Sequence, residues 1–283
     1  MRLYGLLQGL GSVVVAYSGG VDSSYLLAAS VEALGPEKVL AVTAESPTYP
    51  ASEQQAAAEL ARDLGASQRR IATAELEDPN FANNPPERCF YCKGHLFEEL
   101  NAIVREVGFD NVVYGATLDD LGDHRPGMRA AKQQGARAPL LEAALTKDDV
   151  RALSRELGLP TWDKPAMACL ASRFPYYAQI TAEALARVEA AEDLLRNDYG
   201  LRQVRVRHHD TVARLEIEVA ELARLLNDEL RNSIVARLKS LGYTYVTVDL
   251  SGFRSGSMNE VLPPEALGAA AAQFEESNGD GSS

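Results

Sequence analysis

The sequence predicts an α/β protein made of a parallel sheet and a smaller α+β domain. Through residues 1–175, short apolar runs alternate with helical patterns, which is typical of a parallel sheet covered by helices on both faces. From residue 176 onward, one long helical pattern precedes several short strand patterns. We therefore expect two domains, at residues 1–175 and 176–265, followed by a polar, disordered tail at 266–283.

The elements of the first domain follow from its apolar runs and its capping residues. Runs of β-branched and other apolar residues predict strands at residues 13–17, 38–44, 68–73 and 111–115. Helical patterns predict helices at residues 25–34, 52–64, 97–107 and 146–157. Ser52 is a suitable N-cap, and Gly65 and Gly108 each follow a helix end, where glycine is favoured.

The second domain is expected to start with a long helix at residues 181–197, which is rich in Ala, Leu and Glu. Strands are predicted at 202–207, 214–219 and 243–250, with a helical stretch at 221–241. Helices and strands of this kind form a small α+β unit.

The composition favours small molecules and proteins as partners. The formal net charge of −12 argues against a protein whose main task is to bind nucleic acid, because phosphate neutralisation needs patches of Lys and Arg. No apolar stretch reaches the length of a membrane span, and Gln8 and Ser12 interrupt the apolar N-terminus, so we expect neither a membrane anchor nor a signal peptide. These features predict a cytoplasmic protein.

A glycine-rich loop, Ser18-Gly19-Gly20-Val21-Asp22-Ser23-Ser24, joins the first predicted strand to the first predicted helix. This arrangement points backbone N–H groups and the positive end of a helix at an anion. The loop lacks the Lys of the Walker-type loop. It resembles the PP-loop of ATP pyrophosphatases, Ser-Gly-Gly-x-Asp-Ser, at every fixed position. The resemblance implies a Rossmann-like PP-loop fold, and ATP cleaved to AMP and pyrophosphate.

Two further polar segments follow predicted strands, and ligands of open α/β sheets bind at that edge. Thr43 ends the second strand, where it either meets the adenosine of ATP or belongs to an ordinary polar loop. Gly115 ends the fourth strand and allows a nucleotide to approach closely. The other nucleotide or Mg²⁺ candidates of that segment are Thr117, Asp119, Asp120, Asp123 and Arg125.

The three cysteines, Cys89, Cys92 and Cys169, suggest a ligand set or a redox pair rather than a disulfide framework. Three thiolates can hold three irons of a 4Fe-4S cluster and leave the fourth iron open. Zinc would need a fourth ligand, which His95 or His124 can supply. A redox dithiol is a third possibility, and a small buried Cys169 is the plain structural alternative.

Four segments in this order resemble the LarE family of ATP-dependent sulfur transferases, which build the nickel-pincer nucleotide of lactate racemase. They are the PP-loop, Arg-Cys-Phe-Tyr-Cys-Lys, the segment that contains Asp-Asp-Leu-Gly-Asp-His-Arg-Pro-Gly, and Ala-Cys-Leu-Ala-Ser-Arg. The resemblance extends over nearly the whole chain, and the fourth segment is the most discriminating.

The resemblance implies a specific reaction. The substrate would be pyridinium-3,5-biscarboxylic acid mononucleotide, one carboxylate of which is adenylated by ATP and then converted to a thiocarboxylate. In single-cysteine members, the cysteine that matches Cys169 gives up its own sulfur and becomes dehydroalanine. This chain resembles instead the three-cysteine members, in which Cys89, Cys92 and Cys169 would hold a 4Fe-4S cluster with a hydrosulfide as the sulfur donor. The source of that sulfide is not encoded in the sequence.

The resemblance also assigns roles outside the cysteines. Ser172 and Arg173 would contact substrate, and Arg205 and Arg207 would bind its phosphate. Metal ligands would be Asp22 and Asp123 for Mg²⁺, with Glu216, and Asp193 or Glu192, near a metal or a neighbouring subunit. The family further implies a homo-oligomer, a trimer or a hexamer.

From the strand pattern alone, the two arginines on one strand and Glu216 and Glu218 on the next are expected to form a solvated charge ladder.

Three other functions are compatible with parts of the sequence. A PP-loop tRNA thiolase also combines adenylation with cysteines, but it should carry a basic face or an added RNA-binding or zinc module. An ammonia-using PP-loop amidotransferase or synthetase would not need three cysteines at these places. A non-catalytic iron–sulfur or nucleotide-binding protein would not need an intact PP-loop.

Overall fold

The computed structural model describes residues 2–122, 125–165, 168–254 and 256–263. The chain divides into two compact units. The first comprises Met1–Glu75 and Glu87–Met167 together with the C-terminal residues from Leu262, and the second comprises Leu76–Pro86 and Ala168–Val261. Residues 168–175 and Leu76–Pro86 therefore belong to the second unit, whereas the sequence places them in the first domain. The functions expected of the two domains stay predictions.

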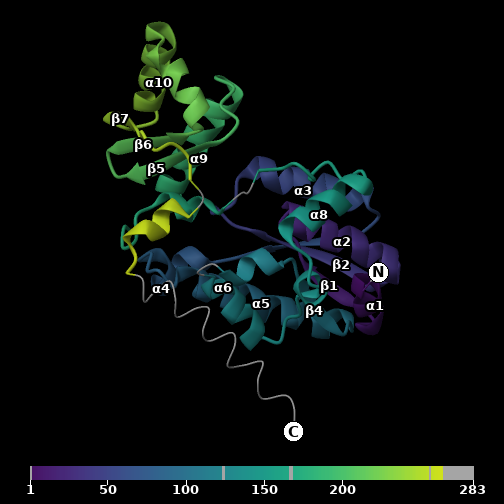
Figure 1. Cartoon of the computed structure of the whole chain (residues 1–283). Coiled ribbons are helices and arrows are strands. Elements are labelled where there is room, and N and C mark those ends of the chain that lie inside the picture. The colour runs from purple at the N-terminus through teal and green to yellow at the C-terminus, as the bar shows by residue number, and fades with distance from the viewer. Residues whose placement is uncertain (1, 123–124, 166–167, 255, 264–283) are drawn as a thin grey trace. The chain divides into compact units, whose positions relative to one another are not determined.

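The first unit contains a four-stranded parallel sheet in the order β3-β2-β1-β4, which confirms the predicted α/β class (Figure 1). Its strands are β1 (Val13–Ala16), β2 (Val39–Glu45), β3 (Ser67–Ala72) and β4 (Asn111–Tyr114). In register, Val13 of β1 lies beside Val39 of β2 on one side and Asn111 of β4 on the other. The carboxyl ends of the strands thus meet at one edge, where the loop of residues 18–24 begins.

Helices cover both faces of this sheet, because successive strand residues point to opposite sides. Val13 and Val15 pack in one apolar cluster with Leu7, Leu27 and Val150, whereas Val14 packs in another with Leu100 and Ile103. The first cluster draws on α1 (Arg2–Gly9), α2 (Val21–Leu34), α3 (Ala51–Asp63), α7 (Pro139–Glu142) and α8 (Lys147–Glu156). The second draws on α5 (Arg88–Val107) and α6 (Pro126–Gln133).

Helix α3 starts at Ala51 with Pro50 as its N-cap, so Ser52 lies inside the helix and is not its N-cap. Two other helices of the first unit begin at least four residues earlier than predicted. Helix α2 starts at Val21, inside the glycine-rich loop, rather than at residue 25. Helix α5 starts at Arg88 rather than at residue 97, so Cys89 and Cys92 lie in its first turns and not in a preceding loop. The aromatic residues, cysteines and Gly94 of this stretch have low helix propensity, which hid the helix. Packing of the following apolar face overrides that propensity.

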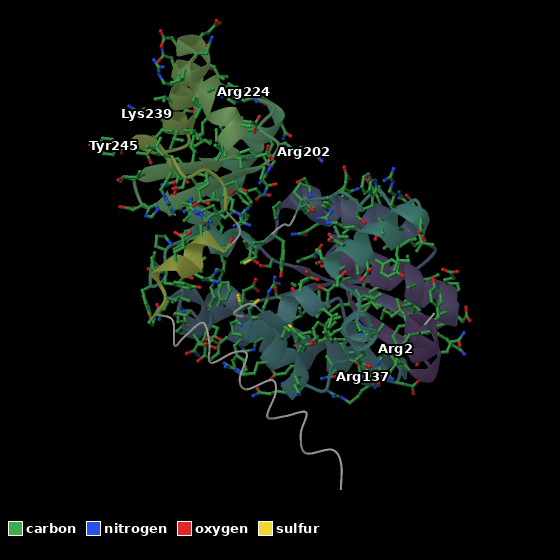
Figure 2. The ribbon with its side chains drawn as sticks, viewed as in Figure 1. Arg2, Arg137, Arg202, Arg224, Lys239 and Tyr245 are labelled. Carbon is green, nitrogen blue, oxygen red and sulfur yellow. The ribbon has the colours of Figure 1, made fainter. Side chains whose placement is uncertain are left out.

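The second unit combines a three-stranded sheet with two main helices. The sheet order is β5-β6-β7, with β5 (Val204–His209) antiparallel to β6 (Val212–Ile217) and β7 (Tyr245–Val248) parallel to β6. Tyr245 is exposed on the edge strand β7 (Figure 2). Helix α9 (Ala182–Asn197) buries Ala191 and Leu195 against Val206 of the sheet. This agrees with the α+β prediction.

The predicted helical stretch at 221–241 is interrupted in the structure. A 3₁₀ helix, Val219–Leu226, ends before α10 (Asp228–Ser240) begins. Asn227 separates the two, because its side chain accepts a hydrogen bond from Leu230 N and caps α10. A short helix, α4 (Pro79–Ala82), completes the unit. Within the described residues, no helix has both the length and the apolar character needed to cross a membrane.

Candidate functional site

The glycine-rich loop occupies the turn from β1 into α2. Gly20 is the N-cap of α2 and provides no side chain to cap it. The first N–H groups of a helix have no intrahelical partner. Those of α2 are therefore directed out of the helix and, together with the positive helix end, are suited to an anion. This is the arrangement that the sequence predicts for residues 18–24.

Gly19 is required at its position for two reasons. Its φ is +71°, and a Cβ there would lie 2.6 Å from Ala57 Cβ of α3. We expect Gly19→Ala to lower the free energy of unfolding by about 1–3 kcal/mol through backbone strain, with a further loss from the clash. Gly5→Ala in α1 is the matched control, because nothing lies within 4 Å of its Cβ position. That control should be neutral or slightly stabilising in urea denaturation. Equal midpoints for the two variants would refute this account of the loop.

The three loop serines differ in exposure. Ser18 is exposed, whereas Ser23 and Ser24 are buried. The Ser23 hydroxyl donates to Gly20 O at 3.2 Å and accepts from Ser18 N at 3.3 Å, so it braces the loop from inside. The Ser18 hydroxyl is exposed at the loop, and the Ser24 hydroxyl is buried without a hydrogen-bond partner among the described residues, so the ligand contacts expected of the three serines stay predictions.

Two lysines from distant segments contact the loop. Lys147 forms an ion pair with Asp22 Oδ2, and Asp22 Oδ1 is buried without a hydrogen-bond partner among the described residues. Lys164 Nζ donates to Gly19 O at 3.1 Å and pairs with Glu53. The loop therefore has cations that its own sequence lacks. Sequence reasoning missed both lysines, and the available signal was Lys147 at the start of a helix, where acidic residues are favoured.

Gly115 lies against the backbone of the first turn of α2. A Cβ at this position would lie 2.9 Å from both Asp22 C and Ser23 N. Gly115 therefore makes room for the backbone of α2, and the expected close approach of a nucleotide stays a prediction.

The polar residues after β4 are engaged in turns and caps. Asp120 Oδ2 accepts from Thr117 N at 2.9 Å, and its Oδ1 pairs with Arg125 at 3.0 Å. Asp119 Oδ2 accepts from Lys147 N at 2.7 Å and so caps α8. These contacts position the segment rather than leave a free carboxylate for Mg²⁺. Asp123, the other predicted Mg²⁺ ligand of the segment, and His124 lie outside the described residues.

The end of β2 also differs from the prediction. β2 continues to Glu45, and Thr43 is buried with its hydroxyl accepting from Gln68 Nε2 at 2.9 Å. Thr43 therefore links two strands inside the sheet. Beyond the strand, Ser46 and Thr48 donate to Glu75 Oε1, and all three side chains are buried. No local sequence pattern indicates Glu75, which lies far along the chain from its partners.

Cys89 and Cys92 lie three residues apart in the first turns of α5, so they share a helix face. Both are free thiols and half-buried. The pKa of the neighbouring Lys93 is raised above its usual value, first by Tyr49, against the opposing effect of burial, and further by Cys92 and Cys89. A cation beside this pair favours the thiolate forms that bind metals.

Cys169, also a free thiol, lies in the second unit at the start of the 3₁₀ helix Leu170–Arg173. Arg173 is 2% exposed and holds this turn: its Nη1 donates to Ala168 O at 2.8 Å and to Ser172 Oγ at 3.0 Å. Its Nε and Nη2 donate to Glu192 at 2.8 and 2.9 Å. Each guanidinium nitrogen thus contacts protein. Arg173 therefore shapes the Cys169 turn, and its contact with substrate stays a prediction.

Glu192 is fully buried at the centre of this network. Besides Arg173 it pairs with Arg196 and accepts from Val206 N at 2.9 Å. Burial alone would raise its pKa, but the charge and hydrogen bonds of Arg173, with Arg196, hold the pKa below its usual value. Glu192 is hence a buried carboxylate anchor, and its oxygens are occupied by arginines. Asp193, the other acid considered near a metal, pairs with Arg196 at 3.4 Å.

The predicted solvated charge ladder is wrong for Arg207 and Glu216. Both side chains are buried and pair at 2.7 Å, and Arg207 also donates to Ser172 O at 2.6 Å and Ser257 Oγ at 2.6 Å. Glu216 additionally faces Arg214 at 3.3 Å. A metal at Glu216 would lie beside two guanidinium groups, so the structure does not support that predicted ligand.

Arg205 is the exception among these arginines. It is 8% exposed and its guanidinium lies 4.6 Å from the centre of the Phe253 ring. Within the described residues, its side chain makes no hydrogen bond. Burial, followed by the nearby charges of Arg173 and Arg207, lowers its pKa to about 10. Arg205 is thus a buried cation close to other cations, and its N–H donors are unused within the described residues. Such a group is suited to binding an anion.

No three His, Cys, Asp or Glu side chains form a metal-binding group within the described residues. The cysteine donor set fits a cluster in its chemistry: three free thiols, two of them on one helix face. Cys89 and Cys92 belong to the first unit, whereas Cys169 belongs to the second. For Mg²⁺, the buried and unpartnered Asp22 Oδ1 is a suitable oxygen ligand.

One family model matches part of the chain, and three relatives match most of it. The NAD synthase family model matches residues 6–83, which contain the loop. An uncharacterized protein of Synechocystis is 41% identical over 89% of this chain and 94% of that protein. The pyridinium-3,5-bisthiocarboxylic acid mononucleotide synthase of Lactiplantibacillus plantarum is 40% identical over 94% of this chain and 95% of that enzyme. An uncharacterized protein of Methanocaldococcus jannaschii is 29% identical over 86% and 91%, respectively.

Proposed function

Because the chain belongs to the LarE family of PP-loop enzymes, we propose that it is an ATP-dependent sulfur transferase that makes a pyridinium thiocarboxylate mononucleotide. Its substrate is pyridinium-3,5-biscarboxylic acid mononucleotide. The observation that carries this proposal is the 40% identity to the bisthiocarboxylic acid mononucleotide synthase over 94% of the chain.

The first unit performs the activation. The N-terminal N–H groups of α2 bind the pyrophosphate portion of ATP, and Lys147 and Lys164 supply positive charge beside it. A substrate carboxylate oxygen attacks the α-phosphorus, and pyrophosphate leaves. Adenylation is needed because a carboxylate resists nucleophiles, whereas an acyl-adenylate has AMP as a leaving group. Asp22 would hold Mg²⁺, which neutralises phosphate charge when bound.

The cysteines supply the sulfur chemistry. Cys89, Cys92 and Cys169 would hold a 4Fe-4S cluster, which supplies an open iron for an inorganic sulfide when bound. In the alternative route, Cys169 itself attacks the acyl-adenylate, displaces AMP, and loses its sulfur to become dehydroalanine. Arg173 holds the carbonyls of the Cys169 turn in either route.

The second unit would bind the phosphate of the substrate. Arg205 is the residue best suited to this task, because its donors are unused within the described residues. Arg207 supports it indirectly through Ser172 and Glu216. We also propose that this unit forms the contacts of a cytoplasmic homo-oligomer, a trimer or a hexamer. Sedimentation of the purified protein tests this, and a monomer at all concentrations would contradict it.

The cluster predicts a specific result for protein purified without oxygen. We expect close to four irons and four sulfides per chain, since three thiolates and one open iron define this cluster type. Cys89→Ala should lose the bound iron because it removes one of three ligands. Iron and acid-labile sulfide assays check both statements. Bound zinc, or a full iron content in Cys89→Ala, would contradict the cluster.

The activity is tested by exchange of radioactive pyrophosphate into ATP. Exchange should depend on the biscarboxylate mononucleotide, because the carboxylate must be adenylated before pyrophosphate can return. Exchange that instead depends on tRNA would favour a tRNA thiolase. An amide formed from ammonium would favour a synthetase of the ammonia-using kind, to which the NAD synthase match at residues 6–83 gives some weight.

A further inference from the structure

The carboxylate of the loop has a partner that a metal ion would have to replace. Asp22 is the acidic residue of the loop, and its Oδ2 is paired with Lys147 Nζ. The other oxygen, Oδ1, is buried and has no hydrogen-bond partner among the described residues. An acid this close to the expected phosphates repels them unless a cation neutralises it. The structure provides that cation as an ammonium group.

Lys147 is held by its backbone contacts, and its side chain is held by its ion pair with Asp22. Thr146 caps α8 with a reciprocal capping box that also involves Asp149, and Lys147 N donates to Asp119 Oδ2 at 2.7 Å. Leu118 N donates to Leu145 O at 2.9 Å and ties the same segment to the end of β4. The lysine side chain itself is a flexible stem with a compact charge. Its exposed fraction of 34% leaves it room to move.

The position of Lys147 is unfavourable for α8 itself. It is the first residue of the helix, where the helix dipole is positive and acidic residues are preferred. The partner of its ammonium belongs to another element, the first turn of α2. This placement therefore serves the loop rather than the helix that carries it.

Lys164 provides a contrast. Its ammonium has two partners, Gly19 O and Glu53, and its side chain is only 19% exposed. No loop carboxylate depends on it. Lys164 therefore clamps the loop, whereas Lys147 neutralises it.

We propose that Lys147 is an exchangeable counter-ion of the loop, which neutralises Asp22 until Mg²⁺ takes its place and then moves to the phosphates of ATP. This proposal rests on the proposed use of ATP. It makes Lys147 a positioning residue that couples metal binding to nucleotide binding. The exchange keeps the charge of the loop balanced with and without a nucleotide.

The exchange makes opposite predictions for metal and nucleotide. In Lys147→Met without nucleotide, Mn²⁺, used as the probe, should bind several-fold more tightly than in wild type, because it no longer displaces an ammonium. A non-hydrolysable ATP analogue with excess Mg²⁺ should bind about tenfold or more weakly, because one charge-assisted hydrogen bond is lost. Calorimetric titration measures both.

Asp22→Asn provides the complementary variant. It should lose Mn²⁺ binding, yet bind the metal-free analogue more tightly than wild type, because Lys147 is already released. Adding Lys147→Met to Asp22→Asn should cancel that gain. Lys38→Met, at an exposed lysine before β2, is the matched control and should behave as wild type.

The outcomes separate this inference from the proposed function. If wild type and Lys38→Met bind no analogue, the use of ATP itself is refuted. If they bind it and Lys147→Met matches them for both probes, only the exchange is refuted. Thermal melting of each variant shows whether it folds. If Lys147→Met does not fold, the titration of Asp22→Asn with the metal-free analogue tests the exchange instead.

Discussion

Glu192→Ala is expected to lower the free energy of unfolding by about 3–5 kcal/mol, because it leaves buried guanidinium charge without its carboxylate. Glu192 is fully buried, and Arg173 beside it is 2% exposed, so water cannot replace the lost partner. Urea denaturation followed by circular dichroism measures the change. Glu192→Gln keeps the shape and should lose less.

Glu183→Ala is the matched control for Glu192 on the same helix. Its ion pair with Arg187 is exposed, with 84% of the Glu183 side chain accessible. Exposed pairs contribute little, so we expect a change of about 0.5 kcal/mol. A loss below about 1 kcal/mol in Glu192→Ala would show that the pair does not anchor the Cys169 turn.

Arg205→Ala is expected to raise the dissociation constant for the substrate mononucleotide by about 10- to 100-fold, the usual value of hydrogen bonds to a charged group. Its stability should be unchanged or higher, because a buried cation that lies near Arg173 and Arg207 is removed. Calorimetric titration with the mononucleotide measures the first effect, and urea denaturation the second.

Two further arginine variants serve as comparisons for Arg205→Ala. Arg207→Ala should be strongly destabilising because it leaves the buried Glu216 without one of its partners. Arg202→Ala, at an exposed residue before β5, should leave substrate binding unchanged (Figure 2). Unchanged binding in Arg205→Ala would remove the proposed phosphate site from this unit.

The sequence predicts the parallel sheet and the glycine-rich loop well, because both depend on local patterns. Val13–Ala16 is a short apolar run, and the loop follows it directly. The start of α5 escapes prediction, since its aromatic residues and Gly94 suggest a loop. Tertiary packing determines the conformation of this stretch, and for that reason the two cysteines lie on a helix.

The electrostatic partners could not be predicted from local sequence. Lys147 and Asp22 are 125 residues apart in the chain, and Arg173 and Glu192 are 19 apart. Strand alternation correctly puts Arg205 and Arg207 on one face, but it does not indicate whether that face is solvated. The structure makes it a buried face, which changes Arg207 and Glu216 from a surface ladder into an internal pair.

The most direct test of the central claim is the mass of the product formed without oxygen from ATP, Mg²⁺, sulfide and pyridinium-3,5-biscarboxylic acid mononucleotide. We predict that one carboxylate oxygen is replaced by sulfur, with one AMP released per sulfur transferred and more than one turnover per chain. AMP release with no sulfur in the product would contradict the assignment as a sulfur transferase.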